Sequence, residues 1–227
     1  MLKVKFFLGV ALLFLVGMPS TASAVILIHE ILADPPTGIL GDANRDGIAS
    51  SANDEFVELF NSSLGAVDIS GWSINDAVRE RHVFFGGTLI QPQSLLVVFG
   101  GGVPDLPGIP WQVASTGTLS LNNSNETVTL LGLHDELIDQ VFFGSEGGND
   151  QSLVRSPEAG KNLFIKHMLL DNAQDRRYSP GEFINPPIVA AAQPPATAAV
   201  PEPATIGYLT IGFISYYAVR RREKGVV

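Results

Sequence analysis

The sequence predicts an all-β fold in which short strands form a sandwich or barrel with two apolar inner faces. Apolar residues recur mostly with a period of two, and clusters of Gly, Pro, Asn and Asp separate the apolar runs. Stretches with the 3.6-residue period of an amphipathic helix are scarce, so a helical bundle does not fit this sequence.

Each expected strand is an alternating or nearly continuous apolar run that ends where turn-forming residues gather. The turns are expected at residues 61–65, 86–87, 91–93, 100–110, 122–125 and 132–136. The expected strands are residues 25–32, 55–61, 67–75, 82–85, 94–99, 118–121, 127–131, 137–143 and 152–155. Trp72 follows Gly71 at a tight strand entry, and a large aromatic residue there is expected to pack in the core.

Composition excludes several classes of function. The chain has no cysteine, which removes disulfides, Cys-ligated zinc, iron–sulfur clusters and a Cys nucleophile. The net charge is −9, and residues 25–200 hold only 8 of the 14 basic residues but 21 of the 23 acidic ones. So acidic a body is repelled by phosphate backbones, which argues against nucleic acid as a partner and favours divalent cations.

The first 24 residues have the pattern of a signal peptide. Lys3 and Lys5 precede an apolar run over residues 6–16, and Ala22 and Ala24 are the small residues that signal peptidase reads. Cleavage after Ala24 is expected, which would export the body. An uncleaved N-terminal anchor is the alternative.

The C-terminal residues follow a different pattern. Residues 185–200 are rich in Pro and Ala and predict an extended linker. Residues 204–219 contain no charged residue and would span about 24 Å as a helix, close to the thickness of a membrane core. The basic stop Arg220, Arg221 and Arg222 follows and predicts a cytoplasmic C-terminus, so a single transmembrane helix is expected.

The motif Val200, Pro201, Glu202 and Pro203 stands directly before this apolar segment. The order of motif, apolar segment and basic stop over residues 201–224 resembles the sorting tail of the PEP-CTERM proteins of Gram-negative bacteria. The resemblance implies that exosortase cuts near the motif. An inner-membrane intermediate would then be released to the cell surface or extracellular matrix. An anchor that is never cut is the alternative.

Phrases spread along the body resemble the lamin tail domain. They are the opening strand at residues 25–34, residues 54–61, the strand entry at residues 68–74, the hairpin at residues 121–131, and the closing segments at residues 150–155 and 178–181. The resemblance implies an immunoglobulin-like β-sandwich over residues 25–184.

Residues 42–47 form a D-x-N-x-D-G loop, the strongest chemical signal in the body. Oxygen atoms of Asp42, Asn44 and Asp46 can converge on a hard cation, Gly47 suits the sharp turn, and the Ile48 carbonyl can add a ligand. The loop has no His or Cys for zinc, so calcium is the expected ion.

The second half of this loop departs from the helix–loop–helix calcium pattern. Position twelve is Asn53 instead of Glu, so Asp54 or Glu55 is the candidate late ligand. Neither flanking helix is predicted, which places the loop between two strands. The alternative is that these residues only make turns.

No catalytic constellation is evident. The four histidines are far apart in sequence, and Glu30 and Glu58 are better explained as hydrogen-bonded or solvent-facing sheet residues than as a catalytic pair. We therefore expect a non-catalytic binding or scaffold module, with extracellular polymer or surface proteins as partners. The alternative is a metal-dependent hydrolase that uses the acidic residues from Asp42 to Glu55, with Glu58 as a further candidate.

Overall fold

The computed structural model describes residues 26–156 and 163–184. The expected signal peptide, the linker, the sorting motif and the apolar tail lie outside the described residues. Within the described ranges, no helix is long and apolar enough to cross a membrane. The helical elements in those ranges are short 3₁₀ turns, namely η1 (Gly38–Gly41), η2 (Leu133–Asp135), η3 (Ser145–Gly147) and η4 (His167–Leu169).

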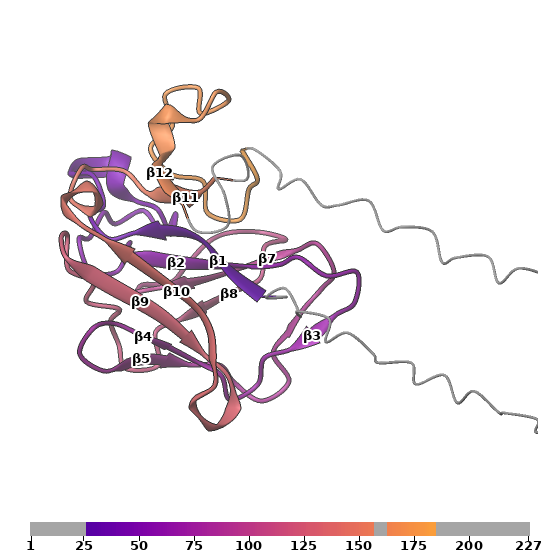
Figure 1. Cartoon of the computed structure of the whole chain (residues 1–227). Coiled ribbons are helices and arrows are strands. Elements are labelled where there is room, and N and C mark those ends of the chain that lie inside the picture. Colours follow the sequence, from indigo (N-terminus) through magenta and orange to yellow (C-terminus); the bar gives the residue numbers. More distant parts are fainter. Residues whose placement is uncertain (1–25, 157–162, 185–227) are drawn as a thin grey trace, which may run out of the picture. The chain divides into compact units, whose positions relative to one another are not determined.

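The strands form two main sheets and a small one, and Figure 1 shows β1, β2 and β7 of one main sheet above β9, β4 and β5 of the other. The six-stranded sheet has the order β12 (Phe164–Lys166), β11 (Leu153–Arg155), β1 (Ile26–Leu32), β2 (Phe56–Asn61), β7 (Leu95–Phe99) and β8 (Trp111–Val113). The four-stranded sheet has the order β10 (Leu137–Phe143), β9 (Glu126–Leu131), β4 (Ser73–Asn75) and β5 (Glu80–Val83). The small sheet pairs β3 (Val67–Asp68) with β6 (Leu89–Ile90).

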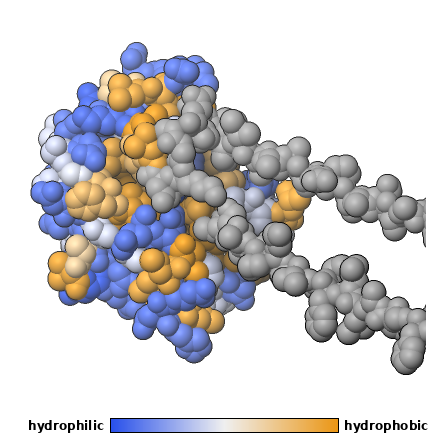
Figure 2. All heavy atoms as spheres, in the orientation of Figure 1, coloured by the Kyte–Doolittle hydropathy of each residue, from blue (hydrophilic) through white to orange (hydrophobic). Residues whose placement is uncertain are grey.

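The main core lies between the two large sheets. Val57 and Leu59 of β2 face Val128 and Leu130 of β9, and all four side chains are fully buried. The alternation of inward apolar residues that predicted the strands therefore builds the sandwich. On the face shown in Figure 2, hydrophobic residues form small patches among hydrophilic ones, as is usual for a protein surface.

The six-stranded sheet also buries its other face. There, Phe56 of β2 and Val97 and Phe99 of β7 form a second cluster with Leu106 and, partly buried, Tyr178. Because both faces are covered, β2 is buried at every position, including its polar residues. Segments outside the strands provide the cover: the β1–β2 loop, the stretch after β7, and residues 176–184, here called the C-terminal segment.

The structure differs from the expected strands in three places. The expected strand 67–75 is divided into β3 and β4, because Gly71 at φ 75° and a turn from Trp72 N to Ile69 O interrupt it. The expected strand 118–121 is absent from the described residues, and Ser120 there has a φ of 47°, which a strand does not allow. Strands β6, β8 and β12 were not expected. The pairing of β8 with β7 is parallel and needs a crossover.

Candidate functional site

The D-x-N-x-D-G loop follows η1 in the β1–β2 connection and is folded by its own side chains. Asp42 Oδ2 accepts a hydrogen bond from Gly47 N at 3.0 Å, and Asn44 Oδ1 accepts one from Asp46 N at 3.0 Å. Asp46 Oδ1 accepts one from Ile48 N at 2.9 Å, and Gly47 has a φ of 87°. The side chains therefore turn the backbone around themselves, with glycine where a positive φ is required.

One oxygen of this loop has no hydrogen-bond partner among the residues that the structure describes. Asp42 Oδ1 is buried and makes no hydrogen bond, although the Asp42 side chain as a whole is only half-buried. A buried carboxylate oxygen without a donor is costly, and a bound cation would satisfy it. The oxygens of Asp46 are instead engaged: Oδ2 accepts a hydrogen bond from Val103 N at 3.2 Å. In the described residues, no three carboxylates of this loop converge on one point.

The carboxylates of the two candidate late ligands, Asp54 and Glu55, accept hydrogen bonds from backbone N–H groups. Asp54 is fully buried and closes the base of the loop, because its carboxylate accepts hydrogen bonds from Asn44 N at 3.0 Å and Ser50 N at 2.6 Å. Glu55 is also buried, and its Oε2 accepts a hydrogen bond from Leu121 N at 3.3 Å. Burial raises the pKa of Glu55 to about 8. The structure therefore links Asn44 to Asp46, holds Asp42 on the Gly47 N–H and does not add Glu55 to this loop.

The glycine run after β7 packs against this loop. A side chain at Gly100 would overlap the Ala52 carbonyl oxygen, and one at Gly102 would overlap the side chains of Asn44 and Asp46. Asn44 Nδ2 also donates to the Gly101 carbonyl oxygen at 3.2 Å. The sequence pattern indicated only a flexible turn here, whereas in the structure the glycines permit close backbone contact with the candidate cation loop.

A second cluster, formed by His29, Glu30 and Glu58, lies on the outer face of the six-stranded sheet. Glu30 of β1 pairs directly with Glu58 of β2, while the preceding pair is Ile28 with Leu59. His29 is therefore an extra residue in a β-bulge, which breaks the usual alternation and brings His29 next to Glu58. Potential ligand atoms of the three side chains lie within 4.8 Å of one another.

All three side chains of this cluster are buried, with exposed fractions of 5% for His29 and 0% for Glu30 and Glu58. Burial lowers the pKa of His29 to about 4. Burial, together with the neighbouring Glu58, raises the pKa of Glu30 to about 7. Burial also raises the pKa of Glu58 well above its usual value. The expectation of solvent-facing glutamates is therefore wrong, and that of hydrogen-bonded ones is confirmed.

The C-terminal segment supplies most of the donors to this cluster. Ser179 donates to Glu30 through its backbone N at 2.9 Å and its hydroxyl at 2.7 Å. Gly181 N donates to Glu58 Oε2 at 2.5 Å. Ser152 Oγ lies 2.5 Å from Glu30 Oε1, and His29 Nδ1 lies 2.8 Å from Glu58 Oε1. Because the C-terminal segment covers the carboxyl groups of Glu30 and Glu58, they are not placed to act on a substrate.

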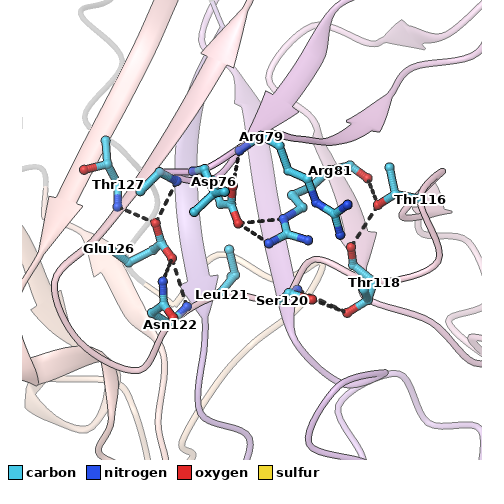
Figure 3. Close-up of polar contacts among 12 residues, drawn as sticks. Asp76, Arg79, Arg81, Thr116, Thr118, Ser120, Leu121, Asn122, Glu126 and Thr127 are labelled. Atoms are coloured by element: carbon cyan, nitrogen blue, oxygen red, sulfur yellow. Dashed lines mark hydrogen bonds and ion pairs between the residues drawn. The ribbon is translucent and has the colours of Figure 1, made fainter.

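A third polar cluster, shown in Figure 3, is also internal to the fold. Arg81 of β5 forms a two-pronged ion pair with Asp76, with Nε 2.6 Å from Asp76 Oδ2. Glu126 of β9 is fully buried and accepts hydrogen bonds from Ala77 N at 2.9 Å and from Asn122 N and Nδ2 at 2.9 and 2.8 Å. Each carboxylate is saturated by local donors, which indicates a structural role.

The sequence pattern predicts the candidate cation loop because its residues are adjacent, but it does not predict the cluster of His29, Glu30 and Glu58. The available signal was the presence of an acidic residue inside each of two apolar strands. Their convergence depends on the pairing of β1 with β2 and on the bulge, neither of which a local pattern contains.

A family model described as the lamin tail domain matches residues 19–145, more than half of the chain. The match covers every strand from β1 to β10 and ends before β11. No curated protein matches the chain.

Proposed function

The chain belongs to the lamin tail domain family, and we propose that it serves as an exported binding or scaffolding module without catalytic activity. The lamin tail domain is a non-enzymatic, immunoglobulin-like binding module. One observation best supports the proposal. The carboxyl oxygens of the buried acids Glu30, Glu58 and Glu126 form hydrogen bonds within the fold. Groups used in this way hold the domain together and are not free for chemistry.

Delivery outside the cell is proposed from the terminal sequence patterns. Residues 1–24 would direct export and then be removed by signal peptidase, and residues 204–219 would hold the body in the membrane until exosortase cuts near Pro201–Pro203. The Pro- and Ala-rich residues 185–200 would then act as a spacer. The mature module would bind extracellular polymer or surface proteins.

We include a structural calcium ion in the proposed function. It is supported by the hard oxygen donors of Asp42, Asn44 and Asp46 and by the buried, unpartnered Asp42 Oδ1. An ion there would order the long β1–β2 loop, which in turn packs on the glycines after β7. The alternative of a metal-dependent hydrolase draws no support from the geometry, because Glu55 bonds to Leu121 instead of joining the loop.

The non-catalytic proposal is tested by incubating the mature protein with polysaccharide, phosphodiester and peptide substrates, with and without divalent cations. We expect no turnover above that of a heat-unfolded control. Hydrolysis that disappears in Asp46→Ala, in a variant that still folds, would support the hydrolase instead.

A further inference from the structure

Glu30 and Glu58 place two acidic groups side by side in the interior, where any negative charge must be balanced. Two ionised carboxylates, directly opposite each other on neighbouring strands and with no exposed surface, would be very costly. In the described ranges, the only basic side chain within ion-pair distance of either carboxyl group is that of His29. Burial favours the neutral form of His29, so it does not supply the missing charge. Protons or a bound cation must therefore balance the pair.

The hydrogen-bond partners permit two neutral acids, although the donors Ser152, Ser179 and Gly181 by themselves lower the pKa values that burial raises. A neutral acid must donate one hydrogen bond, and each of these two carboxyl groups has an acceptor in place. Neutral His29 can accept at Nδ1 from Glu58 Oε1, 2.8 Å away. Ser152 Oγ can accept from Glu30 Oε1 at 2.5 Å, because it can pass its own hydrogen on to the Arg177 carbonyl oxygen at 3.4 Å. The network is thus complete with two neutral acids and a neutral imidazole.

The remaining oxygens of the pair bind the C-terminal segment. Glu30 accepts from the backbone N and the hydroxyl of Ser179, and Glu58 accepts from Gly181 N. Phe183 of the same segment packs edge-on against His29, with ring centroids 5.2 Å apart. This segment covers the acids, so hydrating them as charged groups would require it to move.

We propose that Glu30 and Glu58 are neutral acids in the folded protein and form a proton-dependent lock that holds the C-terminal segment on the sheet and opens as the pH rises. The lock holds the C-terminal segment, which is the last described part of the chain and precedes the linker expected from residue 185.

Other charged groups near the lock are already engaged. Arg155 of β11 pairs with Asp139 at 2.5 Å, and its positive charge lowers the pKa of His29, whereas negative charge on Glu30 would raise it. Glu182 of the C-terminal segment pairs with Arg176 at 2.6 Å, and its negative charge raises the pKa of Glu58 further. Both effects keep His29 and Glu58 neutral.

The direction of the pH effect follows from the raised pKa values. Each acid contributes stability that is fully present below its unfolded pKa of 4.5 and is lost as the pH rises through its folded pKa. That folded pKa is about 7 for Glu30, and it lies well above the usual value for Glu58. The buried histidines have lowered pKa values, so their contribution to stability increases as the pH rises. This increase ends near their unfolded pKa of 6.5. The lock is therefore best observed above about pH 6.5.

The test compares wild type with Glu58→Gln, which keeps the shape of the neutral acid but cannot ionise. Glu55, whose pKa is also raised, titrates in the same window in both proteins and cancels in the comparison. Urea unfolding of the full chain in detergent between about pH 6.5 and 8.5 should show the wild-type folding constant falling relative to the variant as the pH rises. The fall should reach at most about tenfold per pH unit and should end once the pH passes the folded pKa of Glu58. The exposed acid Glu136 provides the control, and Glu136→Gln should track wild type at every pH.

A second readout reports on the segment itself. Amide hydrogen exchange at Ser179 and Gly181, corrected for the intrinsic effect of pH, should lose protection in wild type as the pH rises and keep it in Glu58→Gln. If the variant does not fold, carbon NMR of assigned glutamate carboxyl groups in wild type gives the answer. Those of Glu30 and Glu58, in addition to that of Glu55, should remain protonated at pH values where exposed glutamates are ionised.

Two outcomes would overturn the proposal. One is a wild-type to Glu58→Gln ratio that does not change with pH, or two carboxyl groups that titrate like exposed glutamates. The other is a divalent metal that stays bound in Asp42→Asn and whose removal by a chelator releases the segment, because the cluster would then be a metal site.

Discussion

Tyr178 donates its hydroxyl hydrogen bond to the carbonyl oxygen of Leu40, 2.7 Å away and 138 residues earlier in the chain. The contact joins the C-terminal segment to the β1–β2 loop, and the Tyr178 ring also packs edge-on against Phe56, with centroids 6.4 Å apart. Residues beyond the family match at 145 are therefore part of the folded domain, because they cover the outer face of its six-stranded sheet.

Truncation should reveal this dependence. A chain that ends at residue 145 leaves Phe56 and the two buried glutamates uncovered, so we expect it to be unfolded or aggregated. A matched chain that ends at residue 184 should fold cooperatively. Circular dichroism and urea unfolding of the two chains distinguish these outcomes, and a stable chain ending at 145 would refute the structural role given to the C-terminal segment.

Two glycines with similar backbone geometry should respond differently to alanine. Gly181 and Gly108 have φ values of 82° and 81°, so alanine is strained by about 1–2 kcal/mol at either. A side chain at Gly181 would also overlap Ile109, whereas the space at Gly108 is open. Overlap in a packed region adds about 1–3 kcal/mol. Gly181→Ala should therefore lower the free energy of unfolding more than Gly108→Ala, and equal losses would contradict the close approach.

Adjacent phenylalanines of β10 test the sandwich. Phe143 is 1% exposed and lies in the main core, whereas Phe142 is 67% exposed. Phe143→Ala should cost about 3–5 kcal/mol of unfolding free energy, because it leaves a cavity. Phe142→Ala should change stability by no more than about 0.5 kcal/mol. Denaturant unfolding measures both. Reversed values would mean that β10 presents its other face to the core.

Calcium should stabilise the protein through the D-x-N-x-D-G loop. A specific site occupied at 100 times its dissociation constant adds about 2.7 kcal/mol, so the melting temperature should rise with millimolar calcium and much less with magnesium. Asp42→Asn keeps an oxygen for the Gly47 hydrogen bond but loses the charge, and should remove most of the rise. Asp171→Asn, at an exposed acid outside the loop, should keep it. A wild-type melting temperature unaffected by calcium would reject the site.

Local patterns predicted most of the fold, and long-range relationships account for what they missed. Period-two alternation located β1, β2, β7, β9 and β10, because each buries one or both faces. The strand β8 follows a Gly- and Pro-rich stretch that predicted a long turn, and only its parallel pairing with β7 makes it a strand. Conversely, residues 118–121 alternate like a strand but include Ser120 at a positive φ.

The candidate sites also differ in whether local sequence patterns predict them. Asp42, Asn44 and Asp46 could be predicted as a group because their spacing is local, whereas the directions of Asp54 and Glu55 depend on the turn at Ser50 and on Leu121. Glu30 and Glu58 meet only through strand pairing and the bulge at His29.

The mass of the protein recovered from the cell surface tests the proposed delivery of this module most directly. We expect a form that begins at Val25 and ends near Pro201–Pro203, because both terminal segments are proposed to be removed during export. Recovery of a surface form that keeps residues 204–227 would contradict cleavage of the tail. Recovery of the chain only from the cytoplasm would contradict the exported binding module itself.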